Sequence, residues 1–481
     1  MKHSERHATL TSEICFLTAT NLAEKIRSKQ LSCLEVMQAH LTQIERVNCK
    51  VNAIVTIVAD AALEQARKAD EALSQGQQIG PLHGLPVAHK DLVPTRGVRT
   101  TFGSPIYADH IPDEDGLIIQ RLRDAGAIMV GKTNVPEFGA GSHTFNNVFG
   151  ATLNPYDTSK TCGGSSGGAA VALACGMVPI ADGSDTGGSL RNPANFCNVV
   201  GFRTAPGRVP FWPTDVAWFP ISVQGPMART VQDTALMLSA IAGPDRRAPI
   251  SLGDSGDIFR QSLERTFDGA RIAWSRDLGG LPVDPRVSNV LDARKSVFED
   301  LGFVVTNDVP DFSDADEVFK VWRAWAMELK FAELLETRRD QIKDTVIWNV
   351  ERGMELTGPQ LGRAERKHTA VYQRVREFME HYEYLIMPVS QVPPFDINTE
   401  YPTQIAGTDM ETYIDWMKSC YFITVTGLPA ISVPAGFTED GLPVGVQIVG
   451  RHHDEFGVLQ VAHAFEQATG FWKSRPAVVS E

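Results

Sequence analysis

The residues best suited to chemistry are two serines in glycine-rich turns and one lysine that precedes them. Residues 163–168 read Gly-Gly-Ser-Ser-Gly-Gly, residues 187–189 read Gly-Gly-Ser, and the lysine is Lys90. A serine hydroxyl is a weak nucleophile at neutral pH and needs an adjacent base. Glycines let backbone N–H groups come close to a reacting carbonyl oxygen. This pattern predicts acyl transfer.

Further motifs surround these residues in a fixed order. Gly-Leu-Pro-Val-Ala-His-Lys-Asp occupies residues 84–91, and Gly-Ser-Asp-Thr-Gly-Gly-Ser-Leu-Arg occupies residues 183–191. Gly-Phe-Arg-Thr follows at residues 201–204. With this string of motifs the chain resembles the amidase signature family, from about residue 32 to 471 and most densely between 83 and 242.

The resemblance implies a catalytic role for three side chains. Ser189 would be the acyl-forming nucleophile, Ser165 the bridging serine on a cis peptide bond, and Lys90 the terminal base. The oxyanion hole would consist of four consecutive backbone N–H groups, those of Thr186, Gly187, Gly188 and Ser189. Neither a metal ion nor another cofactor is implied.

The chemistry sets conditions on Lys90. The lysine must be neutral to accept a proton, so its pKa has to fall by roughly three pH units from a free value near 10.4, and burial can achieve this. The apolar residues 85–88 suit a buried strand end. Asp91 follows directly, but neighbouring residues of a strand point to opposite faces, so it need not touch the ammonium. Asp185 and Arg191 flank the nucleophile turn and are predicted to brace it without reacting.

Two short motifs offer competing interpretations. Residues 163–167 fit the Gly-x-Ser-x-Gly elbow of α/β-hydrolases, which would make Ser165 the nucleophile of an esterase with a histidine base. That elbow requires a strand directly before it, whereas residues 154–160 are typical of a polar loop. Residues 126–133 fit a phosphate-binding loop. Their apolar stretch lies inside the motif, so we expect a helix ending at Gly126, then a strand, and a structural Lys132.

Composition excludes several classes of partner. The chain has 481 residues, 43% of them hydrophobic, and a formal net charge of −13, which argues against nucleic-acid and anionic-membrane partners. Residues 1–11 lack the apolar stretch of a secretory signal, and residues 169–181 are too short to span a bilayer. Seven scattered cysteines favour reduced thiols. We therefore expect a cytoplasmic protein. The resemblance implies a small-molecule amide as its substrate, and a homodimer is left open.

The resemblance also implies the fold class. It is α/β: one large α/β/α unit with a central mixed β-sheet covered by helices on both faces, and one catalytic domain over residues 1–481. The signature core would lie at about 83–242 and a variable, substrate-shaping region at about 245–427.

Local patterns place the individual elements of this fold. The pair Ser32 and Glu35 predicts a capped helix. Further helices are expected at 61–73, at 169–175, from Thr230 to 243, between 314 and 381, and near the end of the sequence. Strands are expected at 84–91, 177–181, 270–274 and 303–305. A hairpin is expected to pair 430–435 with 444–449.

Substrate choice is only partly encoded. Residues 211–220 form an aromatic-rich loop containing Trp212 and Trp218, and aromatic residues in loops can line a ligand pocket. Trp322, Trp325 and Trp416 add aromatics from the variable region. The resemblance adds Gly141, Ser142 and Phe145 as substrate-binding candidates. We expect a moderately bulky, uncharged acyl or aryl group.

Other activities stay open at this point. Amide, ester, anilide and carbamate hydrolysis share one acyl-enzyme route. Within the family, the rival is the glutaminase subunit of a tRNA-dependent amidotransferase, which has Glu where Phe145 stands here. Outside enzymes, a non-catalytic binding protein is disfavoured because Lys90, Ser165 and Ser189 are all present.

Overall fold

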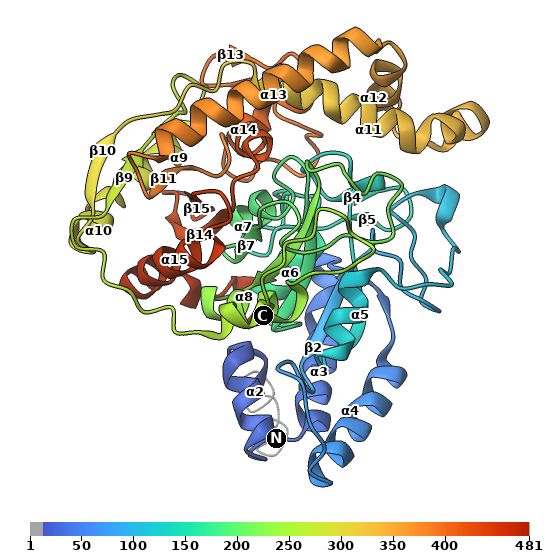
Figure 1. The fold of residues 1–481 in the computed structure, drawn as a ribbon. Helices are drawn as coiled ribbons and strands as arrows, with labels where there is room; N and C mark the ends of the chain where they lie inside the picture. Colours follow the sequence, from blue (N-terminus) through green and yellow to red (C-terminus); the bar gives the residue numbers. More distant parts are fainter. Residues whose placement is uncertain (1–12, 481) are drawn as a thin grey trace.

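The computed structural model describes residues 13–480. Their main feature is an eleven-stranded mixed sheet with the order β1-β3-β2-β6-β8-β7-β14-β15-β11-β9-β10 (Figure 1). Its strands are β1 (Ile54–Ile57), β2 (Pro86–Lys90), β3 (Ile128–Thr133), β6 (Ile180–Asp185), β7 (Val200–Arg203), β8 (Val223–Ala228), β9 (Arg271–Trp274), β10 (Val304–Asn307), β11 (Tyr384–Pro388), β14 (Ala430–Phe437) and β15 (Pro443–Gly450). Two small hairpins lie outside it, β4 (Phe145–Asn146) with β5 (Gly150–Ala151) and β12 (Gln404–Ile405) with β13 (Thr408–Asp409).

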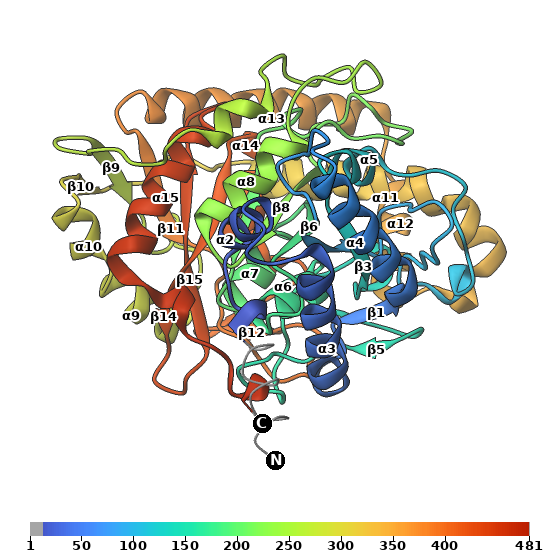
Figure 2. The same cartoon turned by 90° about the horizontal axis from the view of Figure 1, so that it is seen from below.

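Helices cover both faces of this sheet (Figures 1 and 2). The helices are α2 (Ala19–Arg27), α3 (Cys33–Val51), α4 (Ala59–Ser74), α5 (Leu117–Asp124), α6 (Gly167–Ala174), α7 (Arg191–Phe196), α8 (Val231–Ile241), α9 (Pro285–Asp292), α10 (Lys295–Asp300), α11 (Ala315–Arg338), α12 (Asp344–Met354), α13 (Gly358–Met379), α14 (Lys418–Thr426) and α15 (Glu455–Thr469). Helices α6 and α7 contact each other and the central strands, and so do α8 and α15. The predicted α/β fold with a mixed central sheet is confirmed.

Local sequence explains where several elements begin. Ser32 caps α3, and Glu35 completes the capping box by accepting the N–H of Ser32, as the sequence predicts. Thr230 caps α8 in the same region where the sequence predicts a helix start. β14 and β15 pair antiparallel around the predicted turn. These boundaries follow from local hydrogen bonding and need no long-range contact.

One predicted strand is displaced toward the nucleophile turn. The sequence places a strand at 177–181, whereas β6 covers Ile180–Asp185. Gly176 turns the chain with a φ of +67°, and Pro179 has no N–H to give to a sheet ladder, so pairing begins after it. The strand therefore carries Ser184 and Asp185 and delivers the chain directly into the turn that contains Ser189.

The structure also decides between the short motifs. Helix α5 ends before Gly126 and β3 lies inside the phosphate-loop pattern, so the order of elements is the reverse of a phosphate-binding loop. In the described part of the chain, residues 154–162 form only isolated bridges and no strand, so the α/β-hydrolase elbow lacks its strand. Lys132 is fully buried, and its Nζ donates to the carbonyl of Val93 at 2.6 Å and to Thr95 Oγ1 at 2.9 Å.

Helices α11, α12 and α13 form the part of the variable region that stands away from the sheet (Figure 1). Helix α11 packs on both α12 and α13, and both α11 and α13 contact α14. No helix among residues 13–480 is long and apolar enough to cross a membrane. The secretory-signal prediction concerns residues 1–11, which lie outside the described residues. Cytoplasmic location, a homodimer and the single-domain boundaries stay predictions.

Candidate active site

Lys90 lies at the carboxyl end of β2, a strand held between β3 and β6. All five residues of this strand are buried, so the lysine side chain ends inside the protein. Its Nζ lies 2.8 Å from Oγ of Ser165, 2.8 Å from Oγ of Ser166 and 3.0 Å from Oγ of Ser184. Among residues 13–480, the amine therefore has hydroxyl groups and one carbonyl within hydrogen-bonding distance, and no carboxylate.

Burial changes the acid–base properties of Lys90. Removal from water lowers the pKa of the amine from 10.5 to about 7, although the carboxylates of Asp185 and Asp182 act in the opposite direction. The neutral amine is thus well populated near neutral pH, which a general base requires. Asp91 does not contact the amine; its carboxylate accepts the backbone N–H and the hydroxyl of Thr101.

The serine pair lies in the loop that leads into α6. The peptide bond between Gly164 and Ser165 is cis, as the resemblance implies. The N–H of Ser166 donates to the carbonyl of Ser189 at 3.2 Å, which joins the two serine-bearing turns. Among the described residues, no hydrogen bond joins Oγ of Ser165 to Oγ of Ser189, so the predicted relay contact is not formed in this structure.

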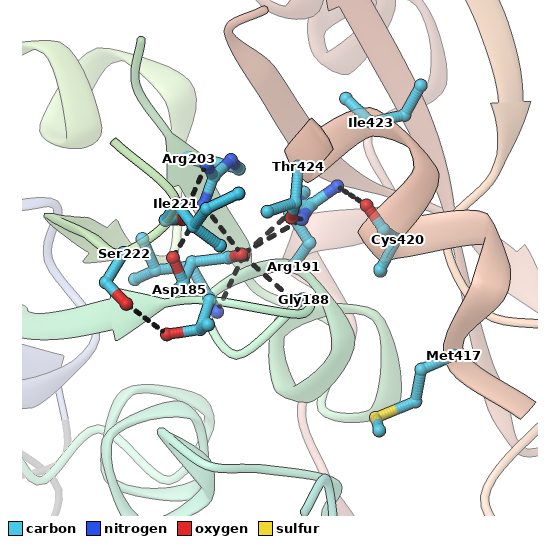
Figure 3. A network of polar contacts seen from close by, with 12 residues as sticks. Asp185, Gly188, Arg191, Arg203, Ile221, Ser222, Met417, Cys420, Ile423 and Thr424 are labelled. Atoms are coloured by element: carbon cyan, nitrogen blue, oxygen red, sulfur yellow. Dashed lines mark hydrogen bonds and ion pairs between the residues drawn. The ribbon is translucent and has the colours of Figure 1, made fainter. Parts of the chain in front are cut away.

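Asp185 organises the nucleophile turn from inside (Figure 3). Its carboxylate accepts two hydrogen bonds from Arg191, at 2.9 and 3.0 Å, and one from Arg203 at 3.2 Å. It also accepts the backbone N–H groups of Gly188 and Leu190, on either side of Ser189. Burial alone would raise the pKa of Asp185, but the two guanidinium groups outweigh it and hold the pKa well below its usual range. The carboxylate is therefore ionised and fixes the turn.

One member of the predicted oxyanion hole is engaged elsewhere. The Gly188 N–H donates to Asp185 Oδ1 at 2.9 Å, so it is not free to bind an oxyanion in this structure. A negative carboxylate is a stronger acceptor than a neutral carbonyl, which explains why the turn closes in this way. The N–H groups of Thr186, Gly187 and Ser189 have no backbone or side-chain acceptor among the described residues. Three of the four predicted donors are thus unengaged in the described part of the chain, and an oxyanion hole at this turn stays a prediction.

The local sequence did not reveal every polar group around Lys90. Ser166 and Ser184 contact Nζ as closely as Ser165 does. His89 and Asp182 form a second buried pair, with Nδ1 2.6 Å from Oδ1. Ser166 lies in the motif at residues 163–168 and Ser184 in the motif at residues 183–191, so both could have been predicted as neighbours of Lys90 from the sequence. The His89–Asp182 pair joins residues 93 positions apart and has no local signal.

The three candidates near residue 145 lie in a tightly packed region. The Ser142 hydroxyl donates to Sδ of Met417 at 2.5 Å and is almost fully buried. The nearest neighbour of Gly141 on its side-chain side is the ring of Tyr413. The Phe145 ring faces Nζ of Lys343, 4.0 Å from its centroid. The side chain at this position is therefore an aromatic ring that faces a lysine ammonium.

An aromatic cavity of about 470 Å³ lies where the loop 211–221 meets α11 and α13. Trp218 and Phe219 of the loop line it with Trp322 and Trp325 of α11, and Asp215, Glu365 and His368 complete its polar side. Trp212 does not; its carbonyl accepts the N–H of Leu117. Trp416 is buried in the core, against Phe395.

The aromatic cavity is close to the nucleophile turn. Ile221 lines it, and the adjacent Ser222 hydroxyl is 2.8 Å from that of Thr186. On α11, Phe319 lies one turn before Trp322, and a Cβ added at Gly187 would come within 2.9 Å of the Phe319 ring. Side chains three residues apart share one side of a helix. An aromatic row on α11 thus leads from the nucleophile turn to the cavity.

Comparison with known proteins now decides the family. The sequence profile of the Amidase family matches residues 35–459. The chain belongs to the amidase family. It is an enzyme that hydrolyses carbon–nitrogen bonds of amides.

Individual relatives of this amidase extend over nearly its whole length. It is 35% identical to an acylamidase of Rhodococcus erythropolis over 96% of this chain and 97% of that one. It is 34% identical to one of the subunits of the glutamyl-tRNA(Gln) amidotransferase of Moorella thermoacetica, over 96% and 99%. Among solved structures, a bacterial aryl acylamidase of the amidase signature family superposes with a TM-score of 0.89 and 29% identity, covering 95% and 98%.

Proposed function

We propose that this amidase cleaves its substrate through an acyl-enzyme formed on Ser189. Oγ of Ser189 attacks the amide carbonyl carbon while its proton passes to Ser165, whose own hydroxyl proton passes to the neutral amine of Lys90. The tetrahedral intermediate carries its negative charge on the former carbonyl oxygen. Preorganised N–H donors stabilise such an oxyanion, and the three unengaged groups are those of Thr186, Gly187 and Ser189.

The same residues then work in reverse. The lysine, now an ammonium, returns a proton through Ser165 to the departing nitrogen, so that the carbon–nitrogen bond breaks with release of a neutral amine. Water attacks the ester on Ser189, gives its proton to the same relay, and releases a carboxylic acid with the serine restored. The predicted roles require a side-chain shift that brings Ser165 Oγ and Ser189 Oγ together when substrate binds, since catalytic hydrogen bonds often tighten only in the complex.

The observation that carries this proposal is the fully buried amine of Lys90, 2.8 Å from Ser165, with a pKa of about 7. Buried charges are usually paired with an opposite charge. Lys132 is also buried without a carboxylate contact, but it donates to the carbonyl of Val93 and to Thr95 and contacts none of the serines. The Lys90 amine faces serine hydroxyl groups instead. This surrounding suits a group that alternates between the neutral and the protonated form.

The substrate we propose is an uncharged amide with a moderately bulky acyl or aryl group. The aromatic cavity next to the nucleophile turn supports this class, because four aromatic side chains line it. Rings of this kind bury large apolar groups and stack on aromatic ones. Esters, anilides and carbamates of similar shape would follow the same route.

Labelling with a serine-directed fluorophosphonate tests the nucleophile. The label should map to Ser189, and Ser189→Ala should abolish both labelling and release of amine from an anilide panel. The matched control is Ser166→Ala, which should keep labelling at Ser189. A label on Ser165 in the wild-type protein would overturn the assignment.

The similarity to glutamyl-tRNA(Gln) amidotransferase subunits supports a second candidate, glutaminase activity within a tRNA-dependent complex. Phe145 opposes it, because its ring carries no negative charge to pair with the ammonium group of glutamine and already faces Nζ of Lys343. Ammonia release from glutamine, measured beside release of aniline from an acetanilide, separates the two. We expect the anilide to be the far better substrate, and the reverse result would favour the glutaminase.

A further inference from the structure

A buried histidine–aspartate pair lies next to the proposed base and has no part in the chemistry described so far. His89 Nδ1 is 2.6 Å from Asp182 Oδ1, and the side chains are 3% and 0% exposed. His89 directly precedes Lys90 on β2, and Asp182 lies on the neighbouring strand β6. The pair is therefore part of the sheet floor beneath the proposed active site.

The carboxylate of Asp182 takes over where the strand pairing ends. The ladder between β2 and β6 pairs Val87 with Ile180 and Ala88 with Ala181, and then stops. Beyond it, the Lys90 N–H donates to Oδ2 of Asp182 at 3.3 Å. One oxygen of the Asp182 carboxylate thus holds the backbone of Lys90, while the other lies next to the imidazole of His89.

Stability alone gives little reason for such a pair. Two polar side chains removed from water lose hydration, and replacing a buried pair with packed apolar groups is often neutral or stabilising. The surrounding strand positions Val87, Ala88, Ile180 and Ala181 are apolar and buried. An apolar pair would fill the same space but would leave the Lys90 N–H without its acceptor, so the role of the carboxylate lies at Lys90.

The charges around Lys90 show what Asp182 can contribute. Asp185 and Asp182 are the two carboxylates that act on the amine, and both favour its protonated form. Asp185 is tied to two arginines, Arg191 and Arg203. Among the described residues, the carboxylate of Asp182 has one titratable hydrogen-bond partner, His89, and its charge also acts on the ammonium of Lys132.

Other titratable groups near the lysine are engaged elsewhere. On β2, Asp91 accepts from Thr101. On β3, the Lys132 ammonium donates to the carbonyl of Val93 and to Thr95. Helix α6, which packs on β2, has only glycine and aliphatic side chains. On α3, His40 Nδ1 lies within hydrogen-bonding distance of the carbonyls of Gly176 and Met177, in the segment that follows α6. Asp182 is therefore the group whose charge at Lys90 can be changed without dismantling the nucleophile turn.

We propose that Asp182 and His89 are a positioning pair for Lys90, in which the Asp182 carboxylate holds the lysine backbone and sets the pH at which the amine becomes a base. This inference rests on the proposed function of Lys90. A negative charge near the amine favours the ammonium, so it strengthens the base and at the same time raises the pH needed to free it. The two effects have opposite consequences for activity at low and at high pH.

Asp182→Asn tests the pair, because asparagine keeps the shape and a carbonyl oxygen for the Lys90 N–H but removes the charge. The midpoint of the acid limb of kcat/KM should move to lower pH, by several tenths of a unit to about one unit. The high-pH plateau should fall, by about threefold to tenfold, because a weaker base transfers the proton less well. When each pH profile of kcat/KM is normalised to its own plateau, the Asp182→Asn profile should therefore lie above the wild-type profile at low pH. Without normalisation, the plateau of the variant should lie below that of the wild type at high pH.

Two control variants separate this effect from a loss of structure. Asp233→Asn removes an equally buried carboxylate, one that accepts the N–H groups of Ala19 and Thr20 far along the chain. It should lower the melting temperature and leave the acid midpoint in place. His89→Gln keeps a donor for Asp182 and should leave the midpoint within about 0.3 pH units of wild type.

Three results would overturn the inference. The first is a lower plateau in Asp182→Asn with an unmoved acid midpoint, which would make the carboxylate structural only. The second is a midpoint that follows His89→Gln instead of Asp182→Asn, and the third is an equal shift in Asp233→Asn. Failure of the proposed function looks different: Lys90→Ala would then keep the wild-type acid limb, whatever the Asp182 variant does.

Discussion

The pH dependence of amide cleavage is the sharpest test of Lys90 as the base. With its pKa lowered from 10.5 to about 7, roughly half of the lysine is neutral at pH 7 and about a tenth at pH 6. A lysine with an ordinary pKa would be neutral in only roughly 0.03% of molecules at pH 7. Burial thus increases the population of the neutral amine at pH 7 by about a thousandfold.

The sign of the effect follows from which form is active. Burial disfavours the ammonium, so the neutral base predominates above the lowered pKa and activity is lost as the pH falls through about 7. The lowered pKa corresponds to a cost of about 5 kcal/mol for holding the charged form in the fold. An expected consequence is that kcat/KM rises about tenfold per pH unit below the midpoint and levels off above pH 8.

The assay is kcat/KM for an anilide between pH 5 and 9, with thermal unfolding measured at each pH to exclude loss of fold. Lys90→Ala should reduce the rate by several orders of magnitude and remove the acid limb. Lys132→Met is the matched control, because Lys132 is equally buried and its pKa is also lowered by burial, to about 8, yet its amine donates to Val93 and Thr95 instead of to the serines. Its profile should keep the wild-type midpoint. A limb that disappears in Lys132→Met and persists in Lys90→Ala would refute the reasoning.

Three further outcomes are expected. Ser165→Ala should lower kcat/KM more for an amide than for an activated ester of the same acid, because only the amide needs its leaving nitrogen protonated. An equal reduction of kcat/KM for the two substrates would exclude the relay. Asp185→Asn should lower the free energy of unfolding by about 3–5 kcal/mol and should also lower the rate of amide hydrolysis, since it leaves two buried guanidinium groups without their anion. A fully stable but inactive variant would contradict a bracing role. Trp218→Ala should raise KM for aryl amides a few fold, because Trp218 lines the aromatic cavity. The melting temperature should stay unchanged, because this residue is 75% exposed. An unchanged KM would show that Trp218 is not part of the binding site.

The sequence predicts those parts of the site that depend on local order along the chain. The apolar residues before Lys90 indicate a buried strand end, and the lysine is buried. Asp185 and Arg191 flank the nucleophile turn by a few positions, and their side chains bond to each other as expected of supports. Short sequence separations restrict the geometry enough for such an inference.

Contacts between distant strands escape this kind of reasoning. Arg203 stands in a quoted motif, but its bond to Asp185 joins residues 18 positions apart and depends on how β6, β8 and β7 are ordered in the sheet. The bond between His89 and Asp182 spans 93 positions. A histidine one residue from a lysine and an aspartate in a later strand have no common pattern until the sheet order brings them together.

The Gly188 amide shows why even a well-placed motif does not fix its own hydrogen bonds. The motif puts consecutive N–H groups beside Ser189, and a glycine there, with a φ of +117°, allows the tight turn. Which of these N–H groups point toward a substrate depends on the competing acceptor beneath the turn. Asp185 is ionised because two arginines reach it from other elements, and an ionised carboxylate draws the Gly188 N–H inward. The same buried ion pairs that make the turn rigid thus decide which amides of the predicted oxyanion hole are left without an acceptor.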